Sequence, residues 1–363
     1  MDDTKYRHLV KPLSVGRMDM QAEEGVPEGA FAMGPGNADK LVWLNGRDHL
    51  EGLNVNFTWG FYSGVGDWHT GLDPHTHPYP ECLVFVGLDP TNIEYLGAEI
   101  EIALGEEQEK HTFDKPTVVV VPAGLPHCPV VTKKVDNPKG FGFYLISLGA
   151  EPETTWLGGD LTVEQAAQIE KMGAERGMKM FVGSAGKSKK TDAEPSETTG
   201  KKYAHLIKTM IPFLGPDGIR EDRRPSGMAR GKDEEFQIGP GNADQLIWMY
   251  GKDLEGLNLN FTWGFYSKPG IWHRRSTGRG AHVHPEPELL VFVGLDPNDM
   301  DYLGAEIEVD MGKEHESHVI NKPGVYICPG GLPHLPMITR WVDKPYGFYV
   351  ISLSDVHASP FID

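Results

Sequence analysis

The sequence is poor in cysteine and contains no long apolar run. Its three cysteines, Cys82, Cys128 and Cys328, are an odd number without CxxC spacing. This excludes a disulfide framework and a zinc knuckle, so we expect buried thiols. No segment approaches the roughly 18 consecutive apolar residues of a membrane span, and the start of the chain lacks the basic and apolar regions of a secretory signal. We therefore expect a cytoplasmic protein with no membrane partner.

Positive charge is also scarce. The chain has 34 lysines and arginines against 52 acidic residues, a formal charge of −18. A surface of this sign repels phosphate backbones, so we expect no nucleic-acid partner. Glycine (44) and proline (28) are abundant and indicate frequent turns between many short strands.

Most of the chain is present twice. The segments that recur are Lys5–Lys11 and Lys202–Lys208, Gly34–Asp39 and Gly239–Asp244, Asn56–Ser63 and Asn260–Ser267, Val84–Pro90 and Val291–Pro297, Tyr95–Glu101 and Tyr302–Glu308, and Phe143–Leu148 and Phe348–Leu353. Two copies of well over a hundred residues indicate a duplicated domain rather than a solenoid. We expect domains at 1–155 and 203–363, with a connecting segment at 156–202.

Within each copy the patterns predict strands. Leu53, Val55 and Phe57 alternate with asparagines, as 257–261 does in the second copy, which predicts half-buried strands. The runs Val118–Val121 and Val325–Ile327 are short and rich in β-branched residues, which suits fully buried strands. Closely spaced strands and turns predict an all-β sandwich or barrel.

One helix is expected between the copies. Thr162 is placed to cap it, Gln165 to reach back to the cap, and Gly177 to end it. The following segment, Gly183–Lys202, has almost no apolar side chain, so we interpret it as a flexible, solvated linker.

Each copy contains the pattern HxHxxxE, followed about 40 residues later by PxGxPH. Histidines two residues apart on a strand face the same side, so both imidazoles can point into one interior. Three imidazoles and a carboxylate suit a divalent first-row metal better than calcium, and iron, manganese, nickel and zinc all stay open. A set that leaves coordination positions free lets a small substrate bind the metal.

These motifs resemble those of the cupin superfamily, specifically a bicupin with two tandem metal-binding domains. The pattern departs from the family at His69, where a glycine is usual, and at Val131 and Ile338, where an asparagine is usual. The resemblance implies two tandem cupin-type β-barrels (jelly rolls, or double-stranded β-helices), joined by the helical and flexible linker, with one divalent transition metal in each. It implies as metal ligands His75, His77, Glu81 and His127 in the first barrel and His282, His284, Glu288 and His334 in the second.

The reaction is less constrained than the fold, because cupins host many activities. We expect an enzyme with a small-molecule substrate, and favour a non-haem Fe(II) dioxygenase-type oxidoreductase. The alternative is a Mn(II)-dependent decarboxylase, lyase or isomerase, and Ni(II) or Zn(II) are possible metals. A second alternative is a non-catalytic binding or storage bicupin. By the same resemblance we expect the chain to form a homo-oligomer.

Other residues have two interpretations each. Arg274, Arg275 and Arg279 precede the second HxH and would either bind an anionic substrate or form a solvated basic loop. His111 and His318 would either support the metal ligands or be exposed strand histidines. The aromatic residues are expected to pack the barrels or, for a minority, to line a substrate pocket: Trp59, Phe61, Tyr62, Trp68, Trp263, Phe265, Tyr266 and Trp272.

Overall fold

The computed structural model describes residues 4–18, 37–69, 73–158, 161–175, 177–183, 201–223, 242–272, 281–357 and 362. They form two compact units. The first unit comprises Gly16–Gly87 and Tyr95–Thr209, and the second comprises Met1–Val15, Leu88–Glu94 and Met210–Asp363. The two units interleave along the chain, so each contains a short segment from the other copy. The domain boundaries expected at 1–155 and 203–363 stay a prediction.

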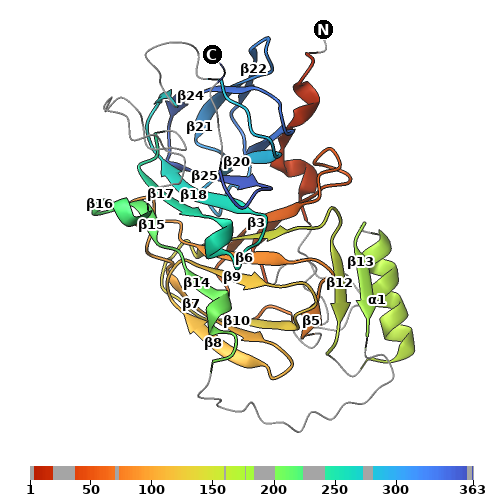
Figure 1. Ribbon diagram of the computed structural model, residues 1–363. Coiled ribbons are helices and arrows are strands. Elements are labelled where there is room, and N and C mark those ends of the chain that lie inside the picture. The colour runs from red at the N-terminus through yellow and green to blue at the C-terminus, as the bar shows by residue number, and fades with distance from the viewer. Residues whose placement is uncertain are drawn as a thin grey trace. The chain divides into compact units, whose positions relative to one another are not determined.

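The first unit is built from two sheets whose strands are antiparallel except for one parallel pair, β12 and β13 (Figure 1). One has the order β14-β9-β6-β11-β3-β2, and the other β13-β12-β5-β10-β7-β8, with β4 paired to β10. The strands are β2 (Lys40–Asn45), β3 (Asn56–Tyr62), β4 (Gly66–Asp67), β5 (His75–Thr76), β6 (Glu81–Val86), β7 (Ala98–Leu104), β8 (Glu109–Phe113), β9 (Thr117–Val121), β10 (His127–Val135), β11 (Phe141–Ser147), β12 (Glu153–Trp156), β13 (Lys179–Val182) and β14 (Ile207–Thr209).

The second unit repeats this design with sheets in the orders β1-β23-β20-β25-β18-β17-β15-β16 and β19-β24-β21-β22. Its strands are β1 (Val10–Pro12), β15 (Pro212–Gly215), β16 (Gly218–Ile219), β17 (Gln245–Met249), β18 (Asn260–Tyr266), β19 (Gly270–Ile271), β20 (Glu288–Gly294), β21 (Ala305–Met311), β22 (Glu316–Ile320), β23 (Gly324–Cys328), β24 (His334–Val342) and β25 (Tyr346–Ser352). The prediction of an all-β protein is therefore confirmed.

Burial along the strands confirms one expectation and corrects another. Strands β9 and β23 are buried at every residue, as their β-branched runs predicted. Strands β3 and β18 are also buried throughout, so the half-buried strands expected from alternation at 53–57 and 257–261 are wrong. The reason is that polar Asn56 is satisfied inside: it accepts a hydrogen bond from Trp43 Nε1 and donates one to the carbonyl of Gly149.

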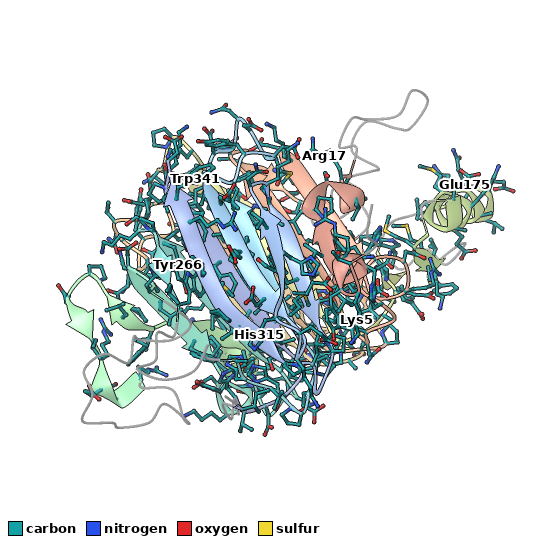
Figure 2. The ribbon with its side chains drawn as sticks, turned by 90° about the horizontal axis from the view of Figure 1, so that it is seen from above. Lys5, Arg17, Glu175, Tyr266, His315 and Trp341 are labelled. Carbon is teal, nitrogen blue, oxygen red and sulfur yellow. The ribbon has the colours of Figure 1, made fainter. Side chains whose placement is uncertain are left out.

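A short arm from one copy completes the sheet of the other copy's unit. In the first unit β14 pairs with β9, and in the second β1 pairs with β23. Glu109 accepts hydrogen bonds from the backbone amides of Lys202 and Tyr203, and Glu316 does the same for Lys5 and Tyr6. Lys5 and His315 mark the second of these junctions in Figure 2.

The arms also account for the burial and the contacts of His111 and His318. Each is buried, with Nε2 2.8 Å from the carboxylate of Glu109 or Glu316, the residues that hold the arms. The expectation of exposed strand histidines is therefore wrong. These contacts link the two histidines to the glutamates that hold the arms rather than to the HxHxxxE cluster.

The expected helix is present as α1 (Val163–Glu175). Gln165 N donates to Thr162 Oγ1, and Thr162 N donates to the Gln165 side chain, which is the predicted capping box. Gly177 follows with φ +71°. The chain then enters β13, which pairs in parallel with β12, and α1 lies along this strand pair (Figure 1).

The rest of the connecting segment is only partly covered. Most of the predicted flexible linker, residues 184–200, lies outside the described residues. Within the part of the chain that the structure covers, no helix has both the length and the apolar character needed to cross a membrane.

Candidate metal centres

The same strands position the ligand set in each unit. His75 lies in β5, Glu81 begins β6 and His127 begins β10, where it pairs directly with His75. In the second unit Glu288 begins β20 and His334 begins β24. His334 also forms an isolated antiparallel bridge with His282. Because the paired strands place these residues side by side, histidines about 50 residues apart in sequence meet.

In the second unit all four predicted ligands converge. His282 Nε2 lies 2.9 Å from His334 Nε2 and 3.0 Å from His284 Nε2. Glu288 Oε1 lies 2.8 Å from His334 Nε2 and 3.1 Å from His284 Nε2. All four residues are buried. The cluster is therefore a compact set of three imidazole nitrogens and one carboxylate oxygen.

The first unit has the equivalent set. The ligand atoms of His75, His77 and His127 form one cluster. Glu81 Oε1 lies 3.0 Å from His127 Nε2 and 3.5 Å from His77 Nε2. The ring centroids of His75 and His127 are 4.2 Å apart. The structure therefore brings together the four residues that the motifs single out in this copy.

Hydrogen bonds fix the tautomers of the first-unit histidines. Nδ1 of His77 lies 2.6 Å from the carbonyl of Glu153, and Nδ1 of His127 lies 3.0 Å from that of Leu125. A carbonyl oxygen only accepts, so each Nδ1 carries the proton and each Nε2 presents a lone pair. These lone pairs face a carboxylate oxygen, which is repulsive unless a cation or proton lies between them. This arrangement fits a bound metal ion.

The candidate ligand atoms of the second unit are closely spaced. Four of their separations lie between 2.8 and 3.1 Å. Atoms this close together could all contact one first-row ion, whose ligand nitrogens lie about 2.1 Å from it.

The charge states suit metal binding. Burial and, to a smaller extent, the proximity of His127 lower the pKa of His75 to about 3. Burial alone would raise the pKa of Glu81, but the surrounding imidazoles outweigh it and lower the pKa to about 2. The pKa of Glu288 is likewise lowered, by His284 and His334 against the effect of burial. Neutral imidazoles and ionised carboxylates are the forms that bind metals.

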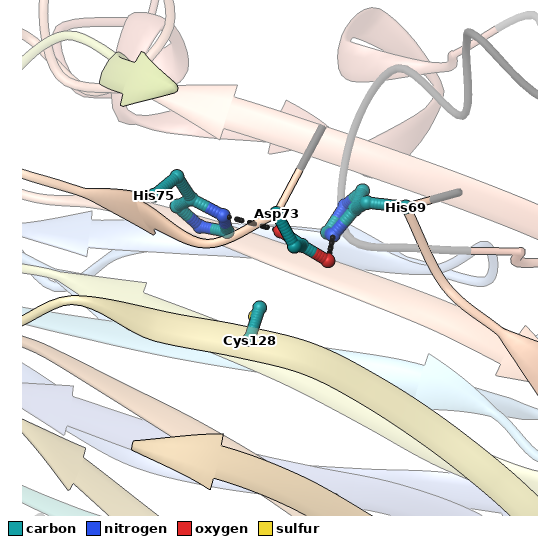
Figure 3. Close-up of side chains that lie close together, drawn as sticks. All are labelled: His69, Asp73, His75 and Cys128. Carbon is teal, nitrogen blue, oxygen red and sulfur yellow. Dashed lines mark hydrogen bonds and ion pairs between the residues drawn. The ribbon is translucent and has the colours of Figure 1, made fainter. Parts of the chain in front are cut away.

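A second group of side chains lies behind His75 (Figure 3). Asp73 Oδ1 is 2.9 Å from His75 Nδ1, and Asp73 Oδ2 is 3.5 Å from His69 Nδ1. Cys128 lies beside them, and all four belong to one cluster of possible ligand atoms. From the sequence, His69 stands out only as a departure from the family pattern, and Asp73 was not predicted. The one sequence feature that could have indicated the contact is that Asp73 precedes His75 by two residues.

A cavity of about 60 Å³ opens onto the first-unit cluster. Its lining includes the four ligand residues and His69, Cys128 and Thr154. The remaining wall is apolar: Trp43, Trp68, Leu83, Val130, Phe143, Leu145, Pro152, Trp156, Met178 and Met180. Of the eight aromatic residues considered from the sequence, all are buried, as packing predicts, and Trp68 also lines this cavity.

Part of the cavity wall comes from the segment between the copies. Trp156, Met178 and Met180 pack with Ile169 of α1 in one apolar cluster. Sequence analysis treated this segment as a connection and missed its place at the site. No local pattern reveals it, because only the pairing of β12 with both β5 and β13 brings these side chains to the cavity.

The second centre has a different neighbour. The ring of His357, which follows β25, lies 4.8 Å from His284 and 4.8 Å from Trp248. Sequence analysis did not single out His357. Arg274, Arg275 and Arg279, the predicted substrate-binding residues, lie outside the described residues.

The first and the second unit thus each place three histidines and a glutamate inside a β-barrel, and comparison with known proteins agrees at the level of fold. No family model matches the chain, and no curated protein does. Among solved structures, an oxalate decarboxylase of Lactobacillus farciminis in complex with formate superposes with a TM-score of 0.54 at 13% identity. The match covers 99% of this chain and 90% of that one.

Two structures of Bacillus subtilis oxalate decarboxylase, one of a mutant and one from a study of its Mn(II) centres, have TM-scores of 0.48 and 0.49 at 13% and 12% identity. They cover 90% of this chain and 75% and 76% of theirs. The match with the TM-score of 0.54 agrees with the fold that the motifs predicted, two cupin-type β-barrels in tandem.

Proposed function

We propose that this protein is a metal-dependent bicupin enzyme that acts on a small carboxylic acid by decarboxylation or a related lyase reaction, with Mn(II) as its metal. The observation that carries the proposal is the first-unit cluster: the three histidines His75, His77 and His127 lie together, Glu81 is within 3.0 Å of His127 and 3.5 Å of His77, and a cavity opens onto them. A purely structural metal site is normally closed by its ligands, whereas a catalytic one keeps open positions.

In this proposal His75, His77, Glu81 and His127 hold the metal of the first unit. A divalent ion bound there polarises a substrate carboxylate or enediolate. The chain's own contribution is to fix the imidazole orientations, through Asp73 and the carbonyls of Glu153 and Leu125. The apolar wall keeps bulk water away from the bound molecule, which strengthens electrostatic interactions within the cavity.

Decarboxylation is preferred here to the dioxygenase that the sequence favoured. The solved structure with the TM-score of 0.54 is an oxalate decarboxylase, and a set of three imidazoles and one carboxylate accommodates Mn(II). Both points support the alternative that the sequence left open. The storage alternative is disfavoured because each unit gathers three histidines and a glutamate, and the first of these clusters opens onto a cavity that could admit a substrate.

We assign turnover to the first unit because the described cavity opens onto its cluster. The second centre, with His357 packed against His284, is proposed to bind metal without turnover.

The test is metal content followed by a stoichiometric assay. We expect about two Mn(II) per chain after purification with manganese, and release of ¹³CO₂ from a panel of ¹³C-carboxyl-labelled small acids. A decarboxylase consumes no net dioxygen, whereas a dioxygenase consumes one O₂ per turnover. If iron is the active metal and one O₂ is consumed per product, the protein is a dioxygenase and the proposed decarboxylation is wrong.

A further inference from the structure

We infer that the cavity of the first unit binds small molecules that carry one negative charge and an uncharged remainder, and that it discriminates against dianions such as oxalate. This inference relies on the proposed function only for the presence of a divalent metal. It concerns binding and needs no turnover.

The first step is the charge of the ligand set. A divalent ion contributes +2 and Glu81 contributes −1. An imidazole that binds an ion through Nε2 while its Nδ1 donates to an oxygen is neutral, so His75, His77 and His127 add no charge to the loaded centre. The loaded centre therefore has a net charge of about +1, which one negative charge on a ligand balances.

The second step is the pair behind His75. His69 and Asp73 both have side chains that are less than a tenth exposed, and they face each other at 3.5 Å. If His69 is protonated the pair is neutral, and if His69 is neutral the pair carries −1. In neither state does this pair supply a positive charge that could balance a second carboxylate of the ligand.

The third step is the wall. None of the described residues that line the cavity is lysine or arginine, and most are aliphatic, aromatic or methionine side chains. A chelating oxalate gives the metal one oxygen from each carboxylate, and its extra negative charge then exceeds the +1 of the centre with no lysine or arginine among the described lining residues to balance it. An unpaired buried charge is strongly unfavourable, whereas a methyl or amide group in the same place is tolerated.

The fourth step is size. A cavity needs roughly 10–15 Å³ to hold one water, so a cavity of about 60 Å³ accommodates a molecule of only a few non-hydrogen atoms. Small 2-oxo and 2-hydroxy monocarboxylates satisfy both conditions. They present two oxygens to a metal and one net negative charge.

Three probes of nearly equal shape separate the effect of the ligand's charge from that of its size. Oxalate has two carboxylates, oxamate replaces one with a neutral amide, and pyruvate replaces it with an acetyl group. Their binding to the Mn(II)-loaded full chain at pH 7 is measured by the electron paramagnetic resonance and water-proton relaxation of Mn(II). Signals from the second centre are removed with the variant His284→Ala, and each affinity is expressed relative to that for free Mn(II) in the same buffer.

When each affinity is divided by that for free Mn(II), we expect the values for oxamate and pyruvate to exceed the value for oxalate by about 10- to 100-fold. The reason is that the protein does not balance the second negative charge of oxalate. Met180→Arg adds a cation to the wall and should shift the ratio toward oxalate by about tenfold. Met180→Gln is the matched polar control and should leave the ratio within about twofold of the wild type. Manganese retained in the second centre of otherwise wild-type chains verifies that both variants fold.

If the wild-type protein prefers oxalate over oxamate and pyruvate by the same factor as free Mn(II) does, the inference is wrong. So would a Met180→Arg variant that folds, binds manganese and leaves the oxalate-to-oxamate ratio unchanged. Absence of manganese from the wild-type chain would instead contradict the proposed function, so the two failures are distinguishable.

Discussion

His75 Nδ1 lies 2.9 Å from Asp73 Oδ1, so a buried carboxylate stands directly behind one ligand of the first centre. The second copy has Gly280 two residues before His282, and glycine offers no side chain for this contact. A carboxylate behind a histidine fixes its orientation and makes its ring a stronger metal ligand. The two candidate metal centres therefore differ in this contact, although each has three histidines and a glutamate as candidate ligands.

Replacing Asp73 should weaken the first centre alone. For Asp73→Ala we expect manganese affinity at that centre to fall about 10- to 100-fold, because the orientation of His75 is lost. Titration with Mn(II), followed by free-ion resonance signal, separates the weakened site from the intact one. Asp73→Asn is the control that keeps the shape, and equal weakening of both centres would contradict this role.

The two centres should lose their metals independently. His77→Ala should remove the metal of the first unit and His284→Ala that of the second, each lowering the content from about two ions per chain to about one. Elemental analysis measures the content, and circular dichroism verifies that the sheets persist. Loss of both ions from either single variant would show that the sites are coupled.

The buried Asn56 should matter more than its exposed neighbour. Asn56→Ala leaves Trp43 Nε1 and the carbonyl of Gly149 without their partner, and we expect a loss of about 1–3 kcal/mol in the free energy of unfolding. Asn54 is exposed and donates a single hydrogen bond to Leu148, so Asn54→Ala should change stability by less than about 0.5 kcal/mol. Denaturant titration of both variants provides the comparison.

Substitution of a glycine can test how much the packing of Tyr203, in the arm of the first unit, contributes to stability. Gly105 and Gly124 have nearly the same positive φ, +75° and +76°, but a Cβ at Gly105 would overlap the ring of Tyr203 whereas one at Gly124 meets nothing within 4 Å. Gly124→Ala should cost about 1–2 kcal/mol from the backbone alone. Gly105→Ala should cost about 1–3 kcal/mol more, from displacement of the arm. Equal losses, measured by thermal unfolding, would show that Tyr203 contributes little packing.

Much of this fold was readable because its signals are local or repeated. The run Val118–Val121 predicts a buried strand since each residue alone favours that environment, and Thr162 with Gln165 predicts a helix start through contacts three residues apart. The eight candidate ligands could be selected because paired motifs preserve their spacing in both copies.

What the sequence did not reveal depends on contacts between distant segments. Met180 reaches the cavity because β13 pairs with β12. Asn56 can be buried because Trp43 donates a hydrogen bond to it and the carbonyl of Gly149 accepts one from it. His111 was misjudged for the same reason, since its partner Glu109 anchors an arm that is about 90 residues away in sequence.

The exchanged arms have a consequence for how the chain is made. Strand β1, at the start of the chain, completes a sheet whose partner β23 is synthesised more than 300 residues later. The second barrel therefore cannot close on the ribosome until nearly the whole polypeptide has emerged. A protease cut between residues 184 and 200 would likewise give two fragments that each carry a strand belonging to the other's barrel, so the nicked protein should stay associated.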